Sequence, residues 1–140
     1  MFIKRTLCIV LSVVLMVNFA LSLTVSAARE PEISPLWNCT SFEFFNLSFA
    51  GKTASITTKI DGANDNVTIN VTIQLYYEYE PGKWTTSGMP YFTHTTTGSL
   101  DVTDRATVSK SGNYKAVMMA HVSDGSVYDY LGDQADATAS

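Results

Sequence analysis

The sequence is poor in the residues on which many catalytic and cross-linked proteins depend. It has two cysteines and two histidines among 140 residues. The histidines, His94 and His121, lie in no G-x-S-x-G or H-E-x-x-H motif. A Ser-His-Asp triad or a zinc hydrolase site is therefore not indicated, and both histidines are expected at the surface. We predict a chain that is not an enzyme and needs no cofactor or metal.

Long apolar runs are almost absent too. The single one spans residues 7–23 and directly follows the positive charges of Lys4 and Arg5. Small residues come next in the chain. A basic start, an apolar stretch and small residues at positions −3 and −1 define a secretory signal peptide. Cleavage is predicted after Ala27, and cleavage after Ala28 fits nearly as well.

The alternative is an uncleaved anchor, because the run approaches the roughly 18–20 residues that span a bilayer. Such an anchor would tether the same domain to the membrane. A good cleavage site and the abrupt change to Arg29-Glu30-Pro31-Glu32 favour cleavage. The expected location is therefore secreted and extracellular.

Removal of the predicted signal peptide, residues 1–27, leaves 113 residues, enough for one domain. Seven basic residues then face 13 acidic ones, which gives a net charge of −6. Nucleic acid and anionic membrane surfaces are excluded as partners, since both require a basic footprint. Cys39 alone remains, so no intrachain disulfide is expected. We expect it to be a small, half-buried apolar side chain near the first strand, and the alternative is a disulfide with a second chain.

Beyond a short leader at residues 28–36, the chain alternates apolar and polar residues with period two. The clearest strand is 67–79, whose apolar positions share one face. These positions are Val67, Ile69, Val71, Ile73, Leu75, Tyr77 and Tyr79. A phase change at Phe45-Asn46 indicates a bulge in the first strand, and Asp104 is expected to break a short strand at 100–102.

Turn signals such as Pro81-Gly82 and Asp124-Gly125 recur every eight to twelve residues, and no helical period is present. This pattern predicts an all-β fold, an antiparallel immunoglobulin-like β-sandwich of about seven strands over residues 37–132, with a barrel as the alternative. The small polar residues 133–140 are expected to form a flexible tail.

One segment carries a resemblance to a known fold family. Ser111-Gly112-Asn113-Tyr114-Lys115-Ala116 resembles the S-G-x-Y-x-C segment of immunoglobulin-like domains, in which the Tyr makes a corner hydrogen bond. Ala116 stands at the Cys position, so the resemblance implies a variant without the disulfide, with Trp84 as an inter-sheet aromatic. The layout is also similar to small secreted proteins of Gram-positive bacteria, which implies a fold and a compartment but no activity.

Aromatic residues are more numerous than a domain of this size must bury. The candidates are Tyr76, Trp84, Tyr91, Phe92, Tyr128 and Tyr130. Outward aromatics stack on sugar rings or anchor a protein partner, and the alternative is cross-strand packing on the outer face. Tyr76, Trp84 and Tyr91 are the weak ligand-binding candidates that we single out.

These observations favour a non-enzymatic binding or interaction module at or outside the cell envelope. Its partner is expected to be a glycan, a cell-wall polymer or an envelope protein. The alternative function is a secreted toxin or bacteriocin-like protein that acts on other cells. Residues 93–97 are β-prone and lack Lys and Pro, so an edge strand there is expected to allow self-association.

Overall fold

The computed structural model describes residues 37–140; the predicted signal peptide, its cleavage site and the whole predicted leader lie outside them. The described residues form eight strands. They are β1 (Thr40–Ala50), β2 (Thr53–Gly62), β3 (Thr68–Glu80), β4 (Lys83–Thr85), β5 (Tyr91–Thr97), β6 (Ser99–Thr107), β7 (Gly112–Ser123) and β8 (Tyr128–Ala139). None of the residues 37–140 forms a helix with the length and apolar character needed to span a membrane.

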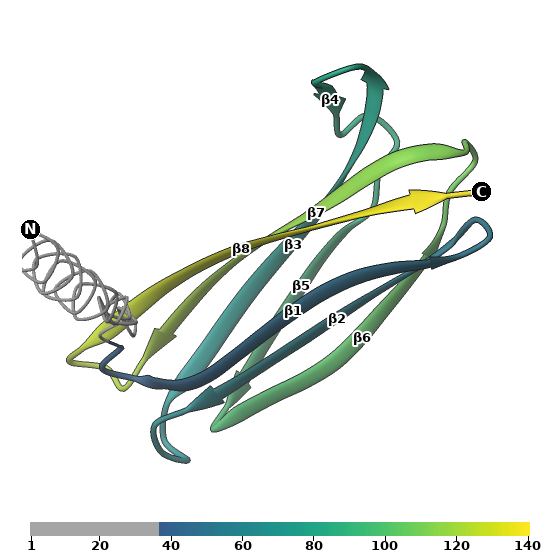
Figure 1. Ribbon diagram of the computed structural model, residues 1–140. Coiled ribbons are helices and arrows are strands. Elements are labelled where there is room, and N and C mark those ends of the chain that lie inside the picture. Colours follow the sequence, from purple (N-terminus) through teal and green to yellow (C-terminus); the bar gives the residue numbers. More distant parts are fainter. Residues whose placement is uncertain (1–36) are drawn as a thin grey trace, which may run out of the picture. The chain divides into compact units, whose positions relative to one another are not determined.

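The strands form two antiparallel sheets (Figure 1). The small sheet has the order β1-β2-β6. In the large sheet β8, β7 and β3 follow one another, and β4 and β5 both pair with the remaining edge of β3. On one side of the sandwich β1 lies beside β8. An immunoglobulin-like domain has this arrangement, with strands A, B and E in one sheet and C, F and G in the other. The predicted fold class is confirmed.

Period-two alternation builds the core between the sheets. Along β3, Ile69, Val71, Ile73 and Leu75 are at most 1% exposed. Side chains from the small sheet and from β7 complete the same cluster. Burial of each such side chain contributes about 1.5–3 kcal/mol, so sheet packing holds the domain together. Cys39 is a free, buried thiol at the start of β1.

Tyr114, at the start of β7, makes the predicted corner. Its hydroxyl donates to the carbonyl of Lys110 at 2.7 Å. Its buried ring lies 5.1 Å, centroid to centroid, from both Phe49 and Tyr77. Burial raises the pKa of this phenol. The inter-sheet role that the resemblance gave to Trp84 is wrong, because Trp84 pairs with Glu78 and lies on the outer side of the large sheet.

The predicted flexible tail at 133–140 is wrong. Strand β8 continues to Ala139 and pairs with β7 along its whole length. Ala137 lies opposite Tyr114 in this pairing. Alanine is a weak strand former, but small side chains at alternate positions fit beside the bulky Tyr114. The sandwich therefore extends over 37–140 and not 37–132.

Two local expectations fail in the small sheet. The irregularity in β1 lies between Thr40 and Phe42 and not at Phe45-Asn46. As a result, Phe42 and Phe44 point outward and are 46% and 44% exposed. Strand β6 is not broken at Asp104 but continues to Thr107.

Asp129 of β8 binds the entry of β1. Its carboxylate accepts the backbone N–H groups of Asn38, Cys39 and Thr40 at 2.9, 2.7 and 2.9 Å. Burial alone would raise its pKa, but these hydrogen bonds outweigh burial and hold the pKa of Asp129 below its usual value. A carboxylate from the large sheet thus fixes the first strand of the small sheet.

Candidate ligand-binding face

The outward side chains of the large sheet form one surface, which we call the aromatic face. Strand pairing defines its members. They are Trp84 on β4; Tyr91, Thr93, Thr95 and Thr97 on β5; Thr68, Asn70, Thr72, Gln74, Tyr76 and Glu78 on β3; Asn113, Lys115, Val117, Met119, His121 and Ser123 on β7; and Tyr128, Tyr130, Gly132, Gln134, Asp136 and Thr138 on β8. All five strands of the large sheet contribute to this surface.

Two predicted binding residues meet at one end of this face. Lys115 lies opposite Tyr76, and its Nζ is 5.3 Å from the centre of the Tyr76 ring and 4.5 Å from that of Trp84. A cation over two ring faces is attracted to both, which holds the rings in place. The sequence suggested Tyr76 and Trp84 separately; the lysine that joins them was missed, because only the strand register brings it there.

A polar depression of about 470 Å³ lies at the same end. Side chains from β3, β4, β7 and β8 line it. They are Glu78, Trp84, Asn113, Tyr114, Gln134, Asp136, Ala137 and Thr138. The depression is shallow and mostly polar, and it combines the Trp84 ring with a few oriented polar groups that could fix the orientation of a bound group.

Hydrogen bonds fix the polar groups of this depression. The Glu78 carboxylate accepts the Gly82 N–H at 2.7 Å and the Asn113 amide at 2.8 Å. The Thr138 hydroxyl in turn donates to the Asn113 side-chain oxygen at 2.9 Å. The Gly82 and Asn113 bonds hold the pKa of Glu78 below its usual value. Glu78 is therefore an ionised acceptor of defined orientation.

The third candidate, Tyr91, belongs to the same face. It is 58% exposed and pairs with Gln74, one outward position along β3 from Tyr76. The structure thus places all three candidate residues, Tyr76, Trp84 and Tyr91, on one surface.

A second aromatic cluster lies at the other end of the face. The ring centroids of His121, Tyr128 and Tyr130 are 5.0–5.6 Å apart. Tyr130 is 74% exposed, and the nearby Met119 is 66% exposed. The sequence placed Tyr128 and Tyr130 among the outward aromatic candidates, but they were not singled out and His121 was not joined to them. The signal was the Tyr128-Asp129-Tyr130 alternation, in which the buried Asp129 turns both tyrosines outward.

The expectation that His94 lies at the surface is wrong. It points inward from β5, and its Nε2 lies 2.7 Å from Oδ2 of Asp104 on β6. The pair links the edge strands of the two sheets.

Among residues 37–140, no three His, Cys, Asp or Glu side chains are grouped so that they would hold a metal ion. Edge-to-edge self-association through β5 stays a prediction.

The strand order defines the class of fold, an immunoglobulin-like sandwich. Comparison with protein-family models and with curated proteins gives no match. Among solved structures, the chain is similar to the ASH / PapD-like domain of human CEP192 (PapD-like domain 7), at 12% identity and a TM-score of 0.49. The likeness covers 84% of this chain and 96% of that chain. The candidate site rests on the geometry of its own residues.

Proposed function

We propose that the mature chain is a non-enzymatic binding module that works at or outside the cell envelope and holds a glycan at the Trp84 end of the aromatic face. The observation that supports this proposal most directly is the pair of rings, Tyr76 and Trp84, that Lys115 holds beside the polar depression. The signal-peptide features of the first 28 residues support the location.

The two parts of this end match the two kinds of surface on a sugar. The C–H groups on the face of a sugar ring are weakly positive and pack on the negative face of an aromatic ring, here Trp84 or Tyr76. Hydroxyl groups at the ring edge hydrogen-bond to oriented acceptors and donors, here Glu78, Asn113 and Gln134. Because these groups are held before binding, less entropy is lost when the ligand binds.

A direct test compares matched aromatic residues on the two outer faces. The secreted chain is incubated with insoluble peptidoglycan, chitin, cellulose and xylan, and the bound fraction is measured. We expect retention on at least one polymer and a loss of at least about tenfold in affinity for Trp84→Ala, as for a buried contact residue.

The control is Phe44→Ala, which removes an exposed aromatic side chain from the small sheet. It should leave binding unchanged. Equal binding by Trp84→Ala and the unmodified chain would overturn the proposed site. Failure of every polymer to retain the chain would overturn the glycan proposal.

A further inference from the structure

We infer that the ligand is an uncharged, linear polysaccharide whose chain runs along the aromatic face from Trp84 to Tyr130. The inference rests on the proposed function and extends it from one sugar subsite to a polymer track. Three observations carry it: the two aromatic clusters, the uncharged surface between them, and an open path over Gly132.

The clusters are far enough apart to bind separate sugar rings of one chain. Along β8, Asp136 lies in the depression beside Trp84, and Tyr130 belongs to the far cluster. Six residues of extended strand separate them, a span of about 20 Å at roughly 3.3 Å per residue. A single sugar cannot contact both ends, whereas an extended chain can.

The surface between the clusters carries no charge. The outward positions there are Tyr91, Thr93, Thr95, Asn70, Thr72, Gln74, Val117, Met119, Gly132 and Gln134. Asp, Glu, Lys and Arg are absent from these ten described positions. In a mature chain of net charge −6, this neutral strip argues against a charged polymer, which needs opposite charges along its track. Hydroxyl and amide groups suit neutral, hydroxyl-rich chains.

Gly132 leaves the path between the clusters open. It lies opposite Met119 on the outward side of β8, between Gln134 and Tyr130. A Cβ atom added at Gly132 would meet nothing within 4 Å. A longer side chain there would stand in the track without clashing with the domain itself, so Gly132→Gln is a steric block that should leave the fold intact.

The far cluster offers a second apolar surface to which a polymer that extends past the depression can bind. Tyr130, Tyr128 and Met119 are 74%, 57% and 66% exposed. Large apolar surface exposed together on a small domain is typical of an interaction site. The neighbouring Thr and Asn side chains are polar, which favours a ligand with both apolar faces and hydroxyl edges over an apolar protein segment.

The test measures affinity by calorimetry for neutral cello-, xylo- and N-acetylchito-oligosaccharides of two to six units. For the type that binds, we expect affinity to rise at least about tenfold from dimer to hexamer. Salt between about 0.05 and 0.5 M should change it less than twofold, since no ion pair is screened. Tyr130→Ala and Gly132→Gln should reduce hexamer affinity to the dimer level and leave dimer affinity unchanged.

The control is Ser48→Gln, an exposed position on the small sheet, which should have no effect. Dimer binding that needs Trp84 but does not strengthen with length overturns the track and leaves the proposed function standing. Tighter, salt-sensitive binding of deacetylated or carboxymethylated chains overturns the neutral ligand. Self-association in sedimentation that Tyr130→Ala abolishes would show that a second copy occupies the face. Absence of all binding overturns both proposals.

Discussion

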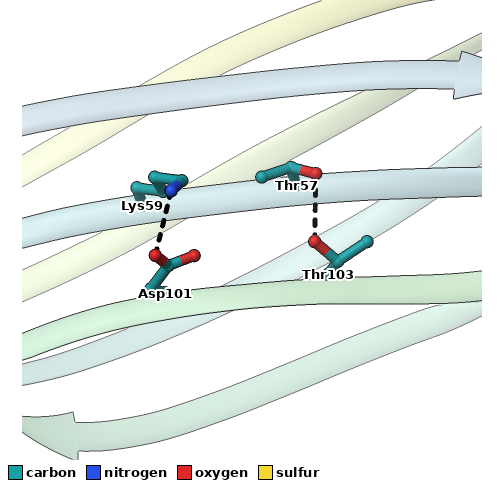
Figure 2. A network of polar contacts seen from close by, with 4 residues as sticks. All are labelled: Thr57, Lys59, Asp101 and Thr103. Carbon is teal, nitrogen blue, oxygen red and sulfur yellow. Dashed lines mark hydrogen bonds and ion pairs between the residues drawn. The ribbon is translucent and has the colours of Figure 1, made fainter.

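The outer faces of the two sheets differ in how their outward side chains are paired across neighbouring strands. On the small sheet, residues opposite one another in β2 and β6 are partners. Lys59 Nζ lies 2.9 Å from Oδ2 of Asp101, and the hydroxyls of Thr57 and Thr103 are 3.1 Å apart (Figure 2). Each of these polar side chains is matched by the residue across from it, as in ordinary cross-strand pairing.

The aromatic face leaves more of its surface unmatched. Met119 lies opposite a glycine, and Tyr130 is more exposed than any other large apolar side chain in the described part of the chain. Both faces come from the same alternating pattern. The difference shows that a strand pattern predicts which residues point outward, while the cross-strand partners decide whether an outward residue is free to bind a ligand.

The largest effect is expected when the Asp129 carboxylate, which joins β8 of the large sheet to the start of β1 in the small sheet, is removed. In Asp129→Asn, the amide nitrogen cannot accept the N–H groups that the carboxylate accepts. We expect a loss of about 1–3 kcal/mol in the free energy of unfolding, the cost of leaving buried donors unpaired. Urea denaturation measures it, and Asp101→Asn in the exposed pair is the control, with a change below about 1 kcal/mol.

The contribution of Asp129 to the stability of the unmodified chain has a defined pH dependence. The folded pKa of Asp129 is lowered, so its stabilising contribution is present above the usual value of 3.8 and is lost as pH falls through the lower folded pKa. Asp129→Asn should remove this acid-dependent part of the stability. An equal loss of stability for Asp101→Asn would contradict the role assigned to Asp129.

Local patterns in the sequence predicted the core well. The alternation of 67–79 predicted the buried face of β3 correctly from Val67 to Leu75, but its last position is wrong, because Tyr79 is 52% exposed. The Ser-Gly-Asn-Tyr segment predicted the Tyr114 corner. The end of β8 was missed because alanine has little strand preference, and its place in the sheet depends on the size of Tyr114 opposite. Asp104 was expected to break its strand because the partner of its carboxylate, His94, lies on another strand, and a local sequence pattern cannot show that pairing.

The candidate site was predicted only in part for a related reason. Tyr76 was found because it interrupts the polar phase of one strand, which is a local signal. Its contact with Lys115 and the grouping of His121 with Tyr130 depend on the register between strands. No single-strand pattern contains that register, so the residues were visible in the sequence but their assembly into a face was not.

A smaller effect is expected from exchanging one lysine on each face. Lys115→Met removes the cation over Trp84 and Tyr76, worth about 0.5–1 kcal/mol at an exposed site. We expect glycan affinity to fall a few-fold and the tryptophan fluorescence to change as the rings loosen. Lys59→Met removes only the exposed pair with Asp101 and should change neither property. A similar loss of affinity in both variants would remove the distinction between the faces.

The smallest effect concerns the carboxylate in the depression. The Gly82 N–H is the main cause of the lowered pKa of Glu78, and the Asn113 amide is the second. Asn113→Ala removes the second cause, so the pKa of Glu78 should rise part of the way to its usual value, as followed by NMR of its side-chain carboxyl carbon. Thr138→Val, which only frees the Asn113 amide to turn, should produce a smaller rise, and Lys59→Met none. An unchanged pKa in Asn113→Ala would mean that Glu78 is oriented by the β3–β4 turn alone and that the depression is less ordered than the hydrogen bonds indicate.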